Sequence, residues 1–301
     1  MSVHRTNNFD FLRLLAALLV LVGHQYVLFD RQAGLPMVAG RSIHVLGLEM
    51  FFAISGCLVG RSWINDQNLF RFFTKRILRI FPALIVVCAV STFILGPALT
   101  SLEIRTYFEH PVTWTYLTHN IALYIEFYLP GVFRENPVKA VNGSLWSLPV
   151  EFLLYVLTAL LGLSTCRLPP WARPSLWIAL CLAAIIARTR LAAWPPDADI
   201  VVYATSLRVT LDVGVYFLGG AVFAGLPRAL LRGPAGLAAL GALVLLPPTL
   251  LGWLDPLLVP YAVLALGSAS WPVLRAFGRF GDFSYGAYLG AFPVQQLVYA
   301  A

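Results

Sequence analysis

A long apolar segment near the start of the chain, residues 9–29, carries two ionisable side chains on one predicted face. A helix that crosses a bilayer needs roughly 20 apolar residues, and this segment supplies them. Arg13 and His24 are eleven positions apart, so in a helix they face the same way, about 16 Å apart along the axis. Ionisable groups within hydrocarbon are costly and usually face a cavity, a partner or a substrate path. The segment is therefore a predicted membrane span with a functional face.

The composition extends this prediction to the whole chain. Of the 301 residues 59% are hydrophobic and 12% charged, and the mean hydropathy is +0.78, whereas soluble domains are about half apolar and a quarter charged. The surplus falls in blocks of about 18 to 22 residues, which predicts an all-α, polytopic transmembrane helical bundle forming one domain over residues 1–301. The last block reaches the final residue, which leaves open whether a tenth helix is missing. The nine expected spans are residues 9–29, 43–60, 80–99, 144–163, 175–193, 208–226, 233–251, 256–271 and 283–301.

The basic side chains predict the orientation. Residues 61–79, expected to be the most strongly positive loop, hold five basic residues and only one acid, so the positive-inside rule makes this segment and the N-terminus cytoplasmic. The segment 114–129 is apolar but short, and a crossing there would turn the later basic loops outward. We therefore expect it to be re-entrant or interfacial on the outer face, with Asp255 in an outer loop and Arg188 as an exception on that side.

Charge and cysteines also limit the partners. The net charge of +7 serves membrane orientation in such a chain, so it does not predict nucleic-acid binding. The cysteines form no CxxC pair and lie in or beside apolar blocks, which predicts neither a metal site nor a disulfide framework. They are Cys57, Cys88, Cys166 and Cys181.

Five motifs in order along the chain carry a family resemblance. They read FDFLRLLAALLVLVGH, FFAISGCLVG, KRILRIFPAL, NGSLWSLPVEFLLY and GDFSYGAYLGAFPVQQ. Together they resemble the acyltransferase-3 family, bacterial inner-membrane O-acyltransferases that acylate cell-surface glycans. The resemblance implies about ten spans, a cytoplasmic acyl-CoA donor and an acceptor hydroxyl on the outer side. It departs at Ala291, where many members have histidine. The residues it implies are needed are Arg13, His24, Arg76, Arg79 and Glu151.

The side-chain chemistry agrees with this resemblance. Transfer to an alcohol needs a base, which a neutral imidazole supplies, and His24 is expected near the outer end of its span. The alternative is a histidine hydrogen-bonded to a neighbouring helix. Arg13 and the cluster Lys75, Arg76 and Arg79 are the expected acyl-CoA cations. Snorkelling or pairing with Asp10 is the alternative for Arg13, and the basic charge expected of any cytoplasmic loop is the alternative for the cluster.

A second polar face is expected in the fourth span. Ser147, Glu151 and Tyr155 are spaced four residues apart and share one helix face. Glu151 is the expected electrostatic partner of His24 or a ligand of the acceptor, and a salt bridge to another span is the alternative. Trp146, Ser147 and Tyr155 are expected to bind the acceptor, although an interfacial tryptophan is often a belt residue.

These observations predict a membrane O-acyltransferase that moves an acetyl group from acetyl-CoA to a glycan hydroxyl, with no bound cofactor. The expected location is the bacterial inner membrane, with lipid, glycan and acyl-CoA as partners. The alternative is a glycan or lipid transporter in which Arg13, His24 and Glu151 line a path. The sequence shows no inverted repeat to favour it.

Overall fold

The computed structural model describes residues 8–301 except 170–171, 196–198, 270 and 278–281. Within this part of the chain, seven helices are long and apolar enough to cross a membrane. They include α1 (Phe9–Leu28), α2 (Ile43–Asn65) and α7 (Ser147–Ser164), the last preceded by the 3-10 turn η3 (Gly143–Trp146). The others are α3 (Leu69–Val90) with its continuation, α8 (Ala172–Leu191), α9 (Leu207–Ala224) and α11 (Pro248–Ser268). These helices confirm the expected all-α fold with several helices long enough to span a membrane.

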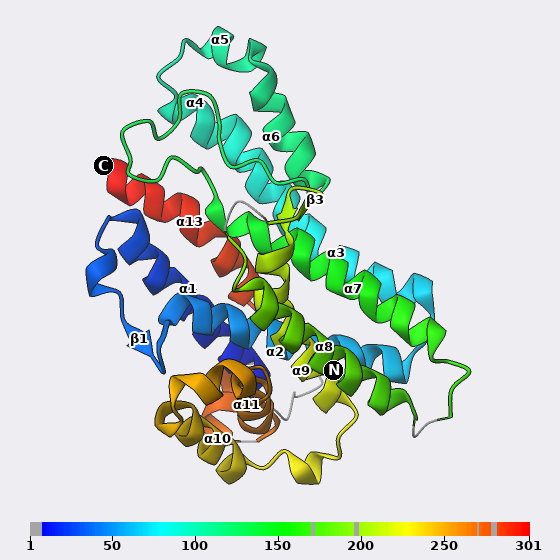
Figure 1. The fold of residues 1–301 in the computed structure, drawn as a ribbon. Helices are drawn as coiled ribbons and strands as arrows, with labels where there is room; N and C mark the ends of the chain where they lie inside the picture. The colour runs from blue at the N-terminus through cyan, green and yellow to red at the C-terminus, as the bar shows by residue number, and fades with distance from the viewer. Residues whose placement is uncertain (1–7, 170–171, 196–198, 270, 278–281) are drawn as a thin grey trace.

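Shorter elements complete the chain (Figure 1). Two shorter helices, α10 and α13, have 13 and 17 residues, and α10 is apolar. Two small antiparallel hairpins, β1–β2 and β3–β4, precede α2 and α9. The remaining bounds are η1 (Gln32–Gly34), β1 (Met37–Val38), β2 (Arg41–Ser42), η2 (Ser91–Leu95), α4 (Gly96–Leu99), α5 (Ile104–Glu109), α6 (Pro111–Ile121), β3 (Val201–Val202), β4 (Thr205–Ser206), η5 (Arg228–Leu230), α10 (Gly233–Leu245), α12 (Pro272–Arg275) and α13 (Ser284–Ala300).

Helix α2 is the centre of the bundle and packs against α1, α7, α9 and α11. Glycines allow its closest approach, which is to α9. A Cβ atom on Gly56 would lie 1.9 Å from the carbonyl oxygen of Phe217, and one on Gly220 would lie 2.1 Å from that of Ala53. Small residues of this kind let membrane helices pack backbone against backbone. Gly56 meets Phe217 and Gly60 meets Ala221 and Ala224, so α2 and α9 run in the same direction. The two hairpins that precede them therefore lie at one end of the bundle, called the hairpin end below, and Asp66 marks the opposite end.

Several expected boundaries were wrong. The segment 61–79 is mostly helical, because α2 continues to Asn65 and α3 begins at Leu69, where the Asn68 side chain accepts a hydrogen bond from the Arg71 backbone N–H. The continuous helical segment Leu69–Leu99 has 31 residues, about 46 Å, so it exceeds a hydrocarbon core of about 30 Å. Hydropathy detects only the part within hydrocarbon, and it therefore missed the first turns with their basic side chains.

The segment near residue 250 also differs from the expectation. The helix boundary falls between Leu245 and Pro248, and Pro256 and Pro260 lie inside α11. Asp255, expected in an outer loop, lies within this helix and is 4% exposed. Within the segment 114–129, α6 ends at Ile121 and packs against α3.

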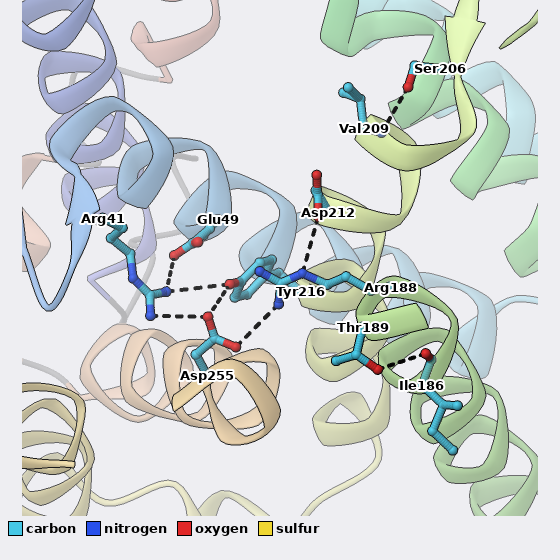
Figure 2. A network of polar contacts seen from close by, with 10 residues as sticks. All are labelled: Arg41, Glu49, Ile186, Arg188, Thr189, Ser206, Val209, Asp212, Tyr216 and Asp255. Atoms are coloured by element: carbon cyan, nitrogen blue, oxygen red, sulfur yellow. Dashed lines mark hydrogen bonds and ion pairs between the residues drawn. The ribbon is translucent and has the colours of Figure 1, made fainter. Parts of the chain in front are cut away.

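A buried ionic network joins these helices (Figure 2). The Arg41 guanidinium contacts the Glu49 carboxylate at 2.6 Å and the Asp255 carboxylate at 3.1 Å. Arg188 contacts Asp255 at 3.3 Å, and the Tyr216 hydroxyl donates to Asp255 at 2.7 Å. The network thus links β2, α2, α8, α9 and α11, and it gives Arg188, an exception to the charge rule in the sequence analysis, two acidic partners.

Replacing Asp255 with alanine should destabilise the protein strongly. The substitution leaves two largely buried arginines without their shared carboxylate, and breaking a buried ion pair in this way costs about 3–5 kcal/mol. The measurement is the thermal unfolding transition in detergent. The matched control is Asp212→Ala, because Asp212 contacts Arg188 at 3.2 Å but its side chain is 51% exposed, and an exposed pair contributes about 1 kcal/mol or less. Equal losses in both variants would contradict a central role for Asp255.

Candidate functional site

Two adjoining cavities lie inside the bundle. The deep cavity holds Glu151 and Ser147 from α7 and Tyr285 and Tyr288 from α13. The second cavity, called the basic cavity, lies toward the Asp66 end and contains Lys75 and Arg76. The residues common to both are Arg13, Ser55 and Arg79. A polar interior therefore runs from the basic cavity toward the middle of the bundle.

Arg13 is buried and is held by carboxylates. Its guanidinium contacts Asp282 at 2.9 Å and Asp10 at 3.9 Å, and Arg13 is 5% exposed. The expected alternative of pairing with Asp10 is thus present, and Asp282 is a partner that the sequence prediction missed. Burial raises the pKa of the Asp282 carboxyl, but Arg13 and hydrogen bonds from Ser284 outweigh it, and the pKa is lowered overall. Asp282 therefore stays ionised and neutralises Arg13.

Arg79 differs from Arg13 because it has no hydrogen bond or ion pair with any described residue, although it lines both cavities. The acidic groups whose charge acts on Arg79 most strongly are Glu151 and Asp282. The N–H groups of a guanidinium without such partners remain available to a ligand. Their planar, forked arrangement matches the oxygens of a phosphate or carboxylate. Arg79 is the cation best placed to bind an anion where the cavities meet.

Arg76 and Lys75 make different contacts. Arg76 is buried, lies over the Phe72 ring at 3.5 Å and donates to the Phe72 carbonyl at 2.7 Å. Its Nε has no hydrogen-bond partner. Lys75 lies at the rim, with its side chain 59% exposed and 3.8 Å from Asp66. The cluster thus offers one exposed and one buried cation to the basic cavity.

Glu151 is held by two hydroxyl groups. Ser55 donates to its carboxylate at 3.1 Å, and Tyr155 donates to the same oxygen. Neither His24 nor an arginine of another helix forms a hydrogen bond or ion pair with it among the described residues, so the expected direct partnership with His24 is not formed. Ser55 of α2 is therefore a polar member of this site.

The expected acceptor-binding residues separate into different surroundings. Ser147 lines the deep cavity and hydrogen-bonds Tyr288 at 2.8 Å. Tyr155 is buried and lines the basic cavity with the cations, because it lies one helical turn beyond Glu151 toward the Asp66 end. Trp146 is half-buried at the start of α7. Tyr288, within a motif quoted above, was missed because its position opposite Ser147 depends on tertiary packing.

His24 lies nearer the hairpin end, away from the residues that line the two cavities. Its ring contacts His44 of α2, with ring centroids 5.8 Å apart, and Phe292 of α13, at 5.6 Å. Neither ring nitrogen of His24 has a hydrogen-bond partner among the described residues. Tyr288 of the deep cavity lies one helical turn before Phe292 on α13, so α13 connects this cavity to His24. The alternative of a histidine bonded to a neighbouring helix is not what the structure has.

The fold and the cavities define a polytopic membrane protein with a cationic and carboxylate-bearing interior. Comparison with known proteins makes this specific, because residues 6–301 match the acyltransferase-3 family, described as an acyltransferase domain. The chain belongs to this family and is an acyltransferase.

Two relatives extend the comparison. The O-acetyl transferase of Shigella phage Sf6 is 28% identical over 305 residues, covering 98% of this chain and 86% of the relative. Nodulation protein 10 of Rhizobium leguminosarum bv. viciae is 34% identical over 165 residues, covering 52% of this chain and 43% of that protein. No solved structure matches the chain.

Proposed function

We propose that the protein is an O-acetyltransferase that moves an acetyl group from cytoplasmic acetyl-CoA to a hydroxyl of a cell-surface or lipid-linked glycan. The observation that carries the proposal is the pair of adjoining cavities that share Arg13, Ser55 and Arg79. The name of the phage relative, an O-acetyl transferase, supports O-acetylation. The donor has several negative charges, which suit the basic cavity.

The proposed orientation follows from where the basic residues lie. Arg71, Lys75 and Arg76 occupy the first turns of α3, next to Asp66. Basic residues at one end of a bundle favour the cytoplasmic side, so the N-terminus is inside and the hairpin end outside. The location is the bacterial inner membrane.

His24 is the proposed general base. The acceptor oxygen attacks the thioester carbonyl carbon while a His24 ring nitrogen takes the hydroxyl proton, which places positive charge on the ring. The new C–O bond replaces the C–S bond, and coenzyme A leaves as its thiolate, which is protonated on release. His24 returns its proton to water. Both ring nitrogens of His24 lack partners among the described residues, which suits this role.

The donor-side residues hold the leaving group. Arg79 binds an anionic group of coenzyme A where the cavities meet, and Arg76 and Lys75 bind near the entrance. Arg13, neutralised by Asp282, shapes the wall between the cavities. The thioester then points along α13 toward His24. Glu151, held by Ser55 and Tyr155, lines the deep cavity beside this path as the proposed electrostatic partner of His24 or ligand of the acceptor.

The experiment uses the protein in sealed vesicles with acetyl-labelled acetyl-CoA and a glycan acceptor on opposite faces. We expect alkali-labile label on the glycan only when the donor is on the face that carries Lys75. Label only with the donor on the other face would overturn the orientation. If folded protein consumes no acetyl-CoA but moves glycan across the membrane, the transporter alternative replaces the proposal.

Arg79→Ala should raise KM for acetyl-CoA by about 10-fold to 150-fold. The substitution removes a charged hydrogen-bond donor that contributes about 1.5–3 kcal/mol, and each 1.4 kcal/mol is about a factor of ten in affinity. The measurement is the steady-state rate against donor concentration. Arg71→Ala is the matched control, because Arg71 lies on the same helix, has a side chain 61% exposed and contacts Asp66. An unchanged KM in Arg79→Ala would remove Arg79 from the donor site.

A further inference from the structure

The residue beside the proposed base is itself a histidine, and the packing around it is tight. His44 lies in the first turn of α2 and faces Gly23 of α1, the residue before His24. A Cβ atom added to Gly23 would lie 2.5 Å from the Cβ atom of His44 and 2.8 Å from its Nδ1. Only glycine at position 23 leaves room for the imidazole. The two helices therefore bring two histidine rings together at the hairpin end.

The polar atoms of His44 are unevenly satisfied. Nε2 lies 3.4 Å from the Ser42 hydroxyl oxygen, whereas Nδ1 is buried and has no hydrogen-bond partner in the part of the chain that the structure describes. Buried polar atoms are nearly always hydrogen-bonded, so an unpaired one needs an explanation. Nδ1 faces α1 at Gly23, the residue before His24, and the two histidine rings are in contact. If the Nε2–H group points to Ser42, Nδ1 keeps a lone pair with nothing to accept.

The distance between the rings suits a bond that forms during the reaction. Two imidazoles joined by a direct N–H···N hydrogen bond have centroids about 5 Å apart, given a heavy-atom separation of about 2.9 Å. The observed 5.8 Å is less than 1 Å longer, within the range of a small side-chain rotation. A neutral His24 already has one N–H group, on the ring nitrogen that does not take the acceptor proton. When the other nitrogen takes that proton, the ring becomes cationic and this N–H group becomes a stronger hydrogen-bond donor.

We propose that His44 is the positioning residue of His24. When one His24 nitrogen takes the proton of the acceptor hydroxyl, the N–H group on the other His24 nitrogen donates to Nδ1 of His44. The inference rests on the proposed function of His24. It gives a neutral imidazole the part that a carboxylate has in a serine-hydrolase triad, where a partner orients the base and stabilises its protonated form. The proton taken from the hydroxyl stays on His24, and no proton passes to His44.

The surroundings of His24 make His44 the group to test. Helix α13 presents Phe292 to the His24 ring, and Gln295 of the same helix is already bonded to the Leu21 carbonyl and the Gln25 side chain. Helix α11 reaches α1 near Phe9, at the far end. Among the described residues, His44 is the titratable group whose side chain contacts His24.

The ionic network described above holds this part of α2 in place. Arg41, three residues before His44, is fixed by Glu49 and Asp255 (Figure 2). Glu49 follows on the next turn of α2, so residues of the ionic network lie on both sides of His44 in the sequence. The position of His44 against Gly23 is therefore maintained by contacts that do not involve the reacting groups.

The test compares His44→Phe, which keeps a planar ring without nitrogens, with His44→Asn, whose amide oxygen can occupy the place of Nδ1. We expect His44→Phe to lower kcat about tenfold with KM for acetyl-CoA unchanged, and to move the acidic limb of the pH–rate profile to lower pH, because protonated His24 loses its partner. His44→Asn should retain much of the wild-type kcat and keep the acidic limb near its wild-type pH. A purely structural role would change the amount of folded protein and leave the limb in place.

Gly23→Ala gives a second route to the same result, since the added Cβ displaces His44. It should reproduce the His44→Phe profile, whereas the matched control Gly241→Ala, at a helical glycine with no atom within 4 Å of the added Cβ, should behave as wild type. If folded His44→Phe keeps wild-type kcat and pH profile while His24→Ala is inactive, this inference fails alone. If His24→Ala transfers normally, the proposed function of His24 fails with it.

Discussion

His24→Ala should lower acetyl transfer by about 10²–10⁴-fold, the contribution usual for a general base, while the protein still binds acetyl-CoA. The side chain has no hydrogen bond to lose, and its ring contacts are His44 and Phe292. Its removal should therefore spare the fold and the donor cations, which lie in the cavities toward the other end of the bundle. The measurement pairs initial rates of labelled transfer with donor binding to the same purified samples.

The matched control for this prediction is His119→Ala. His119 is the histidine that contacts Glu126 at 3.3 Å, with a side chain 43% exposed, and it has no place in the proposed mechanism. It should retain wild-type transfer. Wild-type rates in His24→Ala would make His24 a structural residue, and a matching loss of donor binding would mean that the substitution disturbs the cavities.

Gly56→Ala should prevent assembly of the bundle. The new methyl group would lie 1.9 Å from the Phe217 carbonyl oxygen, and a backbone atom cannot move aside as a side-chain tip can. Helices α2 and α9 would have to separate, and α2 also contacts α1, α7 and α11. We expect no monodisperse protein after detergent extraction, as judged by size-exclusion chromatography at matched expression.

Gly286→Ala serves as the control for Gly56→Ala, because an added Cβ there has no atom within 4 Å and alanine is the better helix former. That variant should be extracted like wild type. A folded, active Gly56→Ala protein would contradict the close α2–α9 packing, and so would normal behaviour of Gly220→Ala, which tests the same contact from α9.

Much of the fold was predictable because hydropathy at bilayer length is a strong signal. The positions of α1, α2, α7, α8 and α9 followed from apolar blocks of the right size. The start of α3 did not, since its basic first turns carry no hydropathy signal. The expected start of a span at residue 256 was wrong, because α11 begins at Pro248 and continues through Pro256 and Pro260, as packed membrane helices tolerate interior proline.

Individual residues of the candidate site were predictable from the sequence, but the contacts between them were not. Arg13, Arg79 and Glu151 were selected from motifs, and they do line one cavity. Asp282 was missed as the partner of Arg13 because 269 positions separate them, and no local pattern pairs residues so distant. Glu151, expected as an electrostatic partner of His24 or a ligand of the acceptor, forms no hydrogen bond or ion pair with His24 among the described residues, and helix spacing, which gives the face of a side chain but not its neighbour, could not decide this.

The ionic network also has a consequence for how the chain is made. An aspartate near the middle of a span costs about 2.5–3.5 kcal/mol during membrane insertion, and Asp255 lies inside α11 with two prolines. Its partners Arg41 and Arg188 are synthesised earlier. Helix α11 should therefore enter the bilayer efficiently only when β2 and α8 are already in place to receive it. Until then Arg41 and Arg188 lack the carboxylate that they share, and Glu49 and Asp212 are the acids already made to pair with them.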